Sequence, residues 1–351
     1  MDRKENLKQT SAVYKYLPGM KPSTLSLNDY RPVDLRECWL LHGRDCGADV
    51  YSYSVLAAET ERVFEAYDGW LNGDVMAFLT EKTVADISEA AKVWGIVDRV
   101  AAGLASIFAS LRRGSPESRA SNSLTAEDWE FWSRCSHVFL VGKLAEGKLG
   151  QCLEERLAHH LNTLGEHGIS VRCFENPQNK TASLLGCAKT EGVCENRVFV
   201  FDFGNTAVKR GRAMATSVNW AIDELPSIIH CDYGKLENNI QNARKLHSEI
   251  AGIIRETIEH FGEECPSYAV SLCMANNIVN GEIMDRGSYR SLRLLSKTYD
   301  KYLKQYLEQT MGKPITLHMI NDAQAAANLF REWSPRAAVV TLGTHMGIAY
   351  P

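Results

Sequence analysis

Residues 197–212 read R-V-F-V-F-D-F-G-N-T-A-V-K-R-G-R, and the fold of the chain can be predicted outward from them. The β-branched and aromatic residues at 198–201 predict a short buried strand. The run 207–209 then predicts the strand that returns beside it. Gly204 and Asn205, which lie between the two, tolerate positive φ better than other residues do. The stretch therefore predicts a β-hairpin with a tight turn.

This turn is also a candidate phosphate site. In a tight turn the backbone N–H groups and the hydroxyl of Thr206 point into one concavity, with the carboxylate of Asp202 at its edge. Such a concavity binds an anion, and a carboxylate can hold a divalent cation through water. Taken alone, D-x-G-x-T is better explained as an ordinary hairpin, so the phosphate hypothesis depends on motifs elsewhere in the chain.

Length and composition favour a globular protein of two lobes. A chain of 351 residues can bury a substantial core, and its length favours two lobes over one. Hydrophobic residues at 45% and charged residues at 23% are ordinary for a soluble protein. A formal net charge of −4 gives no reason to expect nucleic acid or an anionic membrane as a partner.

The chain shows no targeting or membrane signal, so we expect a cytoplasmic protein. The first ten residues, M-D-R-K-E-N-L-K-Q-T, contain no apolar run of the secretory type. The most apolar long stretch, 94–111, includes Asp98 and Arg99, which favours a core helix over a membrane span. Ten scattered cysteines without a C-x-x-C pair predict reduced, packed thiols.

Three of the possible zinc ligands stand close together, at Cys38, His42 and Cys46. Their C-x3-H-x3-C spacing matches no standard structural zinc site, and no fourth ligand is evident nearby. We therefore favour a loop with incidental thiols over a metal site.

A strand-to-helix junction is predicted at 138–150, V-F-L-V-G-K-L-A-E-G-K-L-G. A buried strand here leads through Gly142 and Gly147 into an amphipathic helix. Such a junction places helix N-terminal amides at the carboxyl end of a strand, where α/β sheets bind ligands. Any αβ crossover would show the same pattern.

Two further strand ends carry polar residues. The predicted strand 315–320 ends in Asn321-Asp322, at the start of a helix. Asp322 is either an N-cap that contributes about 1 kcal/mol or a general base at the ligand end of a strand. The predicted strand 337–342 is followed by G-T-H-M-G at 343–347, a turn that can wrap a second phosphate.

Three motifs together resemble the ROK family of sugar kinases and regulators. They are D-x-G-x-T-x-x-K at 202–209, N-D-A-x-A-A-A at 321–327 and T-L-G-T-x-x-G at 341–347. The family lies in the actin-like ATPase superfamily with hexokinase and the Hsp70 chaperones. Residues 197–351 are similar to its N-terminal half, and the first 196 residues look like its C-terminal half displaced to the front.

The resemblance implies a circularly permuted α/β protein with the two-lobed actin-like ATPase (ribonuclease H-like) fold. The larger lobe, on the adenosine side, would comprise residues 1–194 and 324–351. The smaller lobe, with the first phosphate hairpin and the sugar site, would comprise residues 195–323. The new termini would open just after the second phosphate loop, since exposed and adjacent ends tolerate permutation.

The resemblance also implies ATP-dependent phosphorylation of a sugar or amino-sugar hydroxyl. Asp322 would be the general base, and Asn321, Asn276 and Asn277 would bind the sugar. ATP and Mg²⁺ would be the cofactors, with Asp202 holding Mg²⁺ through water, and a homodimer is the assembly considered. The residues implied in nucleotide binding are Gly142, Gly147, Asp202, Gly204, Asn205, Thr206, Lys209, Thr341, Gly343, Thr344 and Gly347.

Departures from the family pattern keep alternatives open. Gly204-Asn205 replaces the usual Gly-Gly, and G-T-H-M-G-I-A at 343–349 replaces G-T-G-x-G-G-G. The family's E-x-G-H segment and its cysteine-rich zinc motif are not intact near residues 25–50. A catalytically degenerate sugar- or nucleotide-binding regulator is one alternative, and a kinase for an amino sugar or small acid is another. No helix-turn-helix pattern precedes the fold, so we do not expect a DNA-binding repressor.

Overall fold

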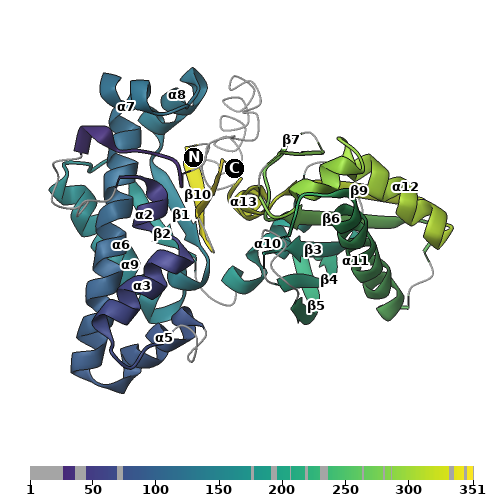
Figure 1. Ribbon diagram of the computed structural model, residues 1–351, viewed down its shortest axis with the longest axis horizontal. Helices are drawn as coiled ribbons and strands as arrows, with labels where there is room; N and C mark the ends of the chain where they lie inside the picture. The colour runs from purple at the N-terminus through teal and green to yellow at the C-terminus, as the bar shows by residue number, and fades with distance from the viewer. Residues whose placement is uncertain are drawn as a thin grey trace. The chain divides into compact units, whose positions relative to one another are not determined.

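The computed structural model describes residues 27–35, 45–68, 74–174, 178–190, 196–205, 207–217, 220–229, 236–262, 265–279, 281–285, 287–331, 336–343 and 346–350. Its helices and mixed sheets form an α/β protein, as predicted (Figure 1). The chain divides into two units, the first comprising Met1–Lys180 with Phe330–Pro351 and the second Thr181–Leu329.

The first unit is built on a sheet that combines strands from distant parts of the chain. Its strands are β1 (His137–Val141), β2 (Ser170–Cys173), β10 (Ala337–Leu342) and β11 (Met346–Ala349), in the order β11-β10-β1-β2. Strands β10, β1 and β2 are parallel, and β11 returns antiparallel to β10. The end of the chain therefore completes a sheet whose other strands precede the second unit (Figure 1).

Helix α6 (Ile87–Arg113) is the central helix of this unit. Asp86 caps its N-terminus and Gly114 ends it at a left-handed φ of 49°. It is the one described helix long and apolar enough to cross a membrane, yet 78% of its apolar window is buried, as expected of a core helix. The surrounding elements are η1 (Val33–Leu35), α2 (Gly47–Val50), α3 (Tyr53–Val63), α5 (Val75–Ala85), α7 (Pro116–Ser121), α8 (Ala126–Arg134), η3 (Lys143–Ala145) and α9 (Gly147–Thr163).

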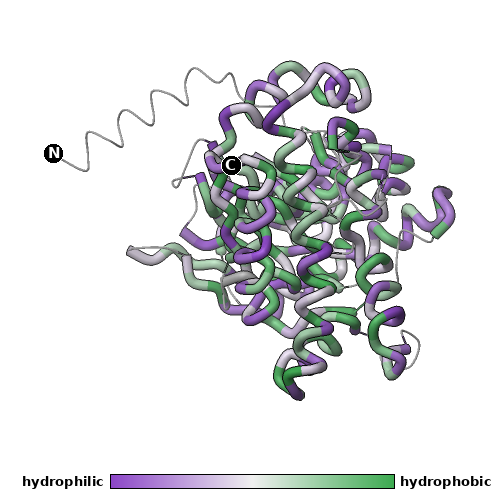
Figure 2. Tube along the Cα trace, turned by 90° about the vertical axis from the view of Figure 1, so that its left-hand side faces the viewer, coloured by the Kyte–Doolittle hydropathy of each residue, from purple (hydrophilic) through white to green (hydrophobic). Residues whose placement is uncertain are grey.

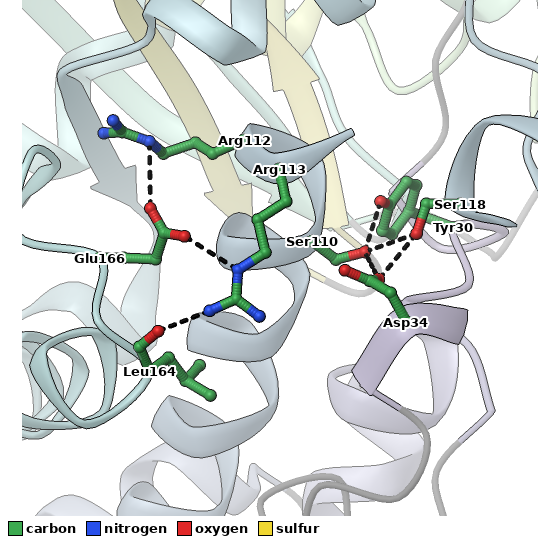
Figure 3. Close-up of polar contacts among 8 residues, drawn as sticks. All are labelled: Tyr30, Asp34, Ser110, Arg112, Arg113, Ser118, Leu164 and Glu166. Atoms are coloured by element: carbon green, nitrogen blue, oxygen red, sulfur yellow. Dashed lines mark hydrogen bonds and ion pairs between the residues drawn. The ribbon is translucent and has the colours of Figure 1, made fainter. Parts of the chain in front are cut away.

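Two polar clusters at the C-terminal end of α6 tie neighbouring segments to it (Figure 3). Ser110 and Ser118 both donate to Oδ1 of Asp34, and the hydroxyl of Tyr30 lies 2.9 Å from that of Ser110. On the opposite side Glu166 accepts from the last two arginines of the helix, 112 and 113. These contacts fasten residues 30–34 and the turn after α9 to the same helix.

The second unit contains the hairpin that the sequence predicts. Strands β3 (Arg197–Phe203), β4 (Ala207–Ala215), β5 (Trp220–Ile229), β6 (Tyr268–Met274) and β9 (Ile315–Asn321) form one sheet in the order β5-β4-β3-β6-β9. The first three run antiparallel, while β3, β6 and β9 are parallel. A small hairpin, β7 (Ile278–Val279) and β8 (Glu282–Ile283), follows β6.

The residues of β3 alternate between two hydrophobic layers, as strand geometry requires. Phe199, Phe201 and Phe203 pack with α11 (Ile240–His260), η5 (Arg290–Leu294) and α12 (Tyr299–Met311). Val198 and Val200 pack on the other face with α10 (Gln178–Ala188) and α13 (Asp322–Ala327), which η6 (Asn328–Phe330) follows. Helical stretches of the tube in Figure 2 likewise alternate between hydrophobic and hydrophilic residues.

The unit boundaries differ from the predicted lobes. The sequence places 181–194 and 324–329 in the larger lobe, whereas the structure includes both segments in the second unit. The reason is the packing of α10 and α13 against β3. At Gly186 of α10, an added Cβ would lie 1.6 Å from the carbonyl oxygen of Ala325 in α13. Such a close backbone approach depends on a residue without a side chain.

Candidate functional site

Three parallel strands of the second unit end at one edge of its sheet. Asp202 on β3 is in register with Cys273 on β6, which is in register with Ile320 on β9. One position further, Met274 pairs with Asn321, the residue before Asp322. The carboxyl ends of parallel strands are where α/β sheets collect ligands. The two predicted aspartates therefore share one strand-end site.

The carboxylate of Asp202 is held by contacts from three elements. Ser183 of α10 donates a 2.6 Å hydrogen bond to Oδ2, and the thiol of Cys273 donates to Oδ1 at 3.6 Å. Lys209, the register partner on β4, places Nζ 3.8 Å from Oδ2. Only 13% of the Asp202 side chain is exposed. The side chain is thus largely enclosed by donors and a cation.

Asp322 is the first residue of α13. Burial is the larger cause and the negative charge of Asp202 the second, and together they raise its pKa from 3.8 to about 7. The main-chain N–H groups of Ala323 and Asp322 and the side-chain amide of Asn321 lower it in part. Each of these donors favours the ionised carboxylate. Asp322 therefore holds a carboxyl group that changes protonation near neutral pH.

Asn321 caps α13 and also braces the neighbouring loop. Its Oδ1 accepts from the main-chain N–H groups of Ala323 at 2.9 Å and Gln324 at 3.3 Å. Its Nδ2 donates to the main-chain oxygen of Asn276 at 2.9 Å. The predicted N-cap thus lies at Asn321, one residue before Asp322. This arrangement leaves Asp322 inside the first turn of the helix.

The other two predicted sugar-binding residues lie in the loop after β6. Asn276 is 5% exposed, and its Nδ2 lies 3.4 Å from the main-chain oxygen of Met284. The main-chain oxygen of Asn277 accepts from the N–H of the same Met284 at 2.9 Å. Both residues hold the β7–β8 hairpin, and the geometry of Asn276 favours that structural role.

The predicted phosphate turn joins β3 to β4, with Thr206 outside the described residues. The N–H of Gly204 donates to the carbonyl of Ala207 at 3.1 Å. Tyr289 donates to the carbonyl of Gly204 at 2.7 Å, and Ser288 donates to Oδ1 of Asn205 at 2.6 Å. The turn is therefore anchored from outside by two hydroxyls of the segment before η5.

The prediction that Gly204 serves this turn through a positive φ is wrong. Gly204 is not among the glycines of positive φ. A Cβ at Gly204 would instead lie 3.0 Å from the carbonyl oxygen of Ala207, which is a tight contact. The position needs a small residue because the two strands approach closely there.

The predicted nucleotide residues of the first unit gather at the carboxyl ends of β1 and β10. Gly142 has a φ of 126°, and a Cβ there would lie 2.3 Å from the carbonyl of Leu342. Gly147, with a φ of 53°, begins α9. Thr341 pairs with the last residue of β1 and with Gly347 of β11, and Gly343 accepts from Tyr51 at 3.1 Å. Thr344 lies outside the described residues.

The predicted thiol-rich loop can be followed only in part. Cys38 and His42 lie outside the described residues, and the thiol of Cys46 donates to Asp49 at 3.3 Å. Within the described ranges, no group of three or more histidine, cysteine, aspartate or glutamate side chains is arranged to hold a metal ion.

Sequence reasoning missed the residues that hold Asp202 and its turn. Ser183, Cys273 and Tyr289 come from three elements outside the motif, and Ser183 precedes Asp202 by 19 residues. No spacing rule links such positions. The sequence offers one signal in the small-residue run A-S-L-L-G-C-A at 182–188, because a helix with few large side chains can approach a neighbour closely.

Fold and site define a mixed α/β protein whose second unit carries a pair of aspartates at the ends of parallel strands. No protein-family model matches the chain, and no curated protein matches it. Its function is therefore inferred from the geometry of this site and from the motif resemblance.

Proposed function

We propose that the protein is an ATP-dependent kinase for a hydroxyl of a sugar or amino sugar, with Asp322 as its general base. The observation that carries this proposal is the pKa of Asp322, raised to about 7 beside a second carboxylate at a strand-end site. A general base is most effective when its pKa lies near the working pH. An N-cap needs no such shift, and the capping role here belongs to Asn321.

The topology supports a permuted actin-like fold. The sheet of the first unit combines β10 and β11, from the end of the chain, with β1 and β2, which precede the second unit. A chain whose halves had exchanged order would have to complete that sheet in this way. The second unit supplies an antiparallel hairpin, β3–β4, in the same sheet as the parallel strands β6 and β9.

The donor set suits a hard divalent cation. Mg²⁺ in kinases is typically held by one or two carboxylates, with water and phosphate oxygens completing its shell. Burial and, after it, the negative charge of Asp202 raise the pKa of Asp322, and a cation near the two carboxylates would relieve their repulsion. Asp202 would hold the ion through water. ATP would supply the phosphoryl group, and bound Mg²⁺ would neutralise the negative charge of its phosphates.

The remaining roles fall to residues already positioned in each unit. Asp322 accepts the proton of the sugar hydroxyl, and Asn321 keeps its carboxylate oriented at the start of α13. The turn at Gly204 and Asn205, anchored by Tyr289, is the proposed first phosphate contact. The glycine turns at the ends of β1 and β10 are the proposed nucleotide contacts of the first unit.

A catalytically degenerate regulator of the same fold is the alternative, and one observation favours it. The side-chain amide of Asn321 is used internally at both ends, and Asn276 is 5% exposed. Of the three predicted sugar contacts, Asn321 is therefore engaged within the protein, and Asn276 is buried. A sugar sensor would need neither proton transfer nor a complete second phosphate loop.

The test is phosphoryl transfer by the wild-type protein and by the Asp322→Ala and Asp322→Asn variants, against a panel of hexoses and hexosamines. We expect ATP turnover with at least one sugar, and a loss of roughly 10²- to 10⁴-fold in both variants. Nucleotide binding, measured by calorimetry, should persist in both. Asp223, an exposed residue of β5, gives the matched control Asp223→Asn.

Two results would reject the kinase assignment. One is unchanged turnover in both Asp322 variants. The other is an absence of turnover in the wild type together with a thermal shift on adding sugar alone, which would favour the regulator.

A further inference from the structure

Helix α10 contacts both elements that carry the two aspartates. Through Ser183 it donates to Asp202 at the end of β3, with 2.6 Å between the oxygens. Through Gly186 it lies against the backbone of Ala325 in α13, where an added Cβ would be 1.6 Å from the carbonyl oxygen. One face of a single helix therefore connects β3 to the helix that begins with Asp322.

Further hydrogen bonds fix α10 in place. Asn328, which follows α13, donates from Nδ2 to the carbonyl of Gly186 at 3.0 Å and to the hydroxyl of Thr190 at 3.3 Å. Ser271 of β6 donates to the carbonyl of Cys187 at 2.7 Å. The helix is thus attached to the sheet below it and to the end of α13 beside it. Because several separate contacts hold α10, the loss of any single one leaves the helix, and Ser183 with it, in place.

Among the described residues, Ser183 makes the most directional contact with the carboxylate of Asp202. Its 2.6 Å separation lies in the range of hydroxyl-to-carboxylate bonds, which are short and strong. The thiol of Cys273 is a weak donor, and Lys209 at 3.8 Å is beyond hydrogen-bond distance. Because the terminal torsion of aspartate is broad, a carboxylate plane is fixed only by directed donors.

We propose that Ser183 is a positioning residue for Asp202, and that α10 sets the placement of Asp202 relative to Asp322. Ser183 fixes the plane of the Asp202 carboxylate, and Gly186 fixes α13 against the same helix. The catalytic consequence of this arrangement depends on the proposed kinase function. Its structural consequence does not.

The kinetic test compares Ser183→Ala, Ser183→Thr and Ser271→Ala in the full-length protein. Removing the Ser183 hydroxyl should lower kcat roughly 10- to 100-fold, the usual cost of losing a residue that orients a ligand of a metal. KM for the sugar should stay unchanged. Threonine keeps the hydroxyl at a half-buried position and should restore kcat. Ser271→Ala removes a bond to α10 without touching Asp202 and should leave kcat near the wild-type value.

A crystal structure of each metal-free variant supplies a readout that needs no activity. The Asp202 carboxylate should rotate or occupy two orientations in Ser183→Ala, and keep one orientation in Ser183→Thr and Ser271→Ala. An unrotated, single carboxylate in Ser183→Ala would overturn the proposal. Equal loss of kcat in Ser271→Ala and Ser183→Ala would also overturn it, since both would then act through the docking of α10. A wild type that transfers no phosphoryl group would reject the kinase function, while the crystal structures would still decide the role of Ser183.

Discussion

Asn321 and Asn276 are joined by a 2.9 Å hydrogen bond from the side-chain Nδ2 of the first to the main-chain oxygen of the second. The other end of the same amide caps α13 through Ala323 and Gln324. One side chain therefore connects the end of β9, the loop after β6 and the first turn of the helix that carries the proposed base. An asparagine expected to contact sugar has, in the structure, the geometry of a brace for Asp322.

Replacement of Asn321 should separate this bracing role from ordinary capping. Asn321→Ala should lower the free energy of unfolding by about 0.5–2 kcal/mol, the usual cost of an N-cap, and reduce phosphoryl transfer. Asn239→Ala removes the N-cap of α11, where Oδ1 accepts from Asn242 at 2.9 Å, and should cost similar stability. Its transfer rate should stay normal. Chemical denaturation and turnover measurements of both variants check this. Equal rates of phosphoryl transfer in the two would show that Asn321 does not position Asp322.

Asn321→Ala should also move the pH dependence of kcat/KM to higher pH. The amide of Asn321 lowers the pKa of Asp322 because it favours the ionised form. Without it, the pKa of Asp322 should rise above about 7, and the acidic limb of kcat/KM should move to higher pH. A limb that moves to lower pH would contradict the assignment.

Asp202→Asn should shift the pKa of Asp322 in the opposite direction. The negative charge of Asp202 is the second cause, after burial, of the raised pKa. Neutralising it should lower the pKa of Asp322 towards the ordinary value of 3.8. Because Asp202 is also the proposed magnesium residue, this variant should be inactive. Carbon-13 NMR of the aspartate carboxyl groups in the metal-free protein can follow the titration, and an unchanged value would show that burial alone raises it.

Stability should also depend on pH through Asp322. Its folded-state pKa lies above the unfolded value, so the folded protein binds the proton more tightly. The contribution to stability is complete below pH 3.8 and is lost as pH rises through about 7. Asp322→Asn removes this dependence, so its melting temperature should exceed that of the wild type by a margin that grows from pH 4 to 7. At pH 8 the free energy of unfolding of Asp322→Asn should exceed that of the wild type by on the order of 2–4 kcal/mol. A margin independent of pH would show that the pKa of Asp322 is not raised.

Local chemistry made some of this site predictable from the sequence. The β-branched and aromatic run at 198–201 and the turn at Gly204-Asn205 predict the β3–β4 hairpin, because strand and turn preferences depend on adjacent residues. Asp322 was located at a strand end for the same reason. Ser183, by contrast, reaches Asp202 only through packing of α10 on the sheet. The boundary at 181–194 was misplaced because a helix before a strand gives no local sign of the side on which it packs.

Gly186 should tolerate no side chain. Alanine there would place a methyl carbon about 1.6 Å from the carbonyl oxygen of Ala325, which neither backbone can avoid without moving. Gly186→Ala should therefore lower the free energy of unfolding by about 3 kcal/mol or more, and separate α10 from α13. Gly252 of α11 is the matched control, because nothing lies within 4 Å of a Cβ at that position. Gly252→Ala should stabilise the protein by up to about 1 kcal/mol through helix propensity. Denaturant unfolding of both variants checks the contrast, and a neutral Gly186→Ala would show that α10 does not lie against α13 as described.

The turn between β3 and β4 should lose its anchor in Tyr289→Phe. The phenol is fully buried and donates to the carbonyl of Gly204 at 2.7 Å, so its removal should cost about 0.5–1.5 kcal/mol of stability. The freed turn should bind the nucleotide less well, which raises KM for ATP more than it lowers kcat. Tyr299→Phe removes an equally buried hydroxyl, bonded to His247 at 3.0 Å on α11, and should cost similar stability with no change in KM. Steady-state kinetics with varied ATP distinguish the two variants. Equal KM values would mean that the turn holds no phosphate, and the hairpin would then be only a structural element.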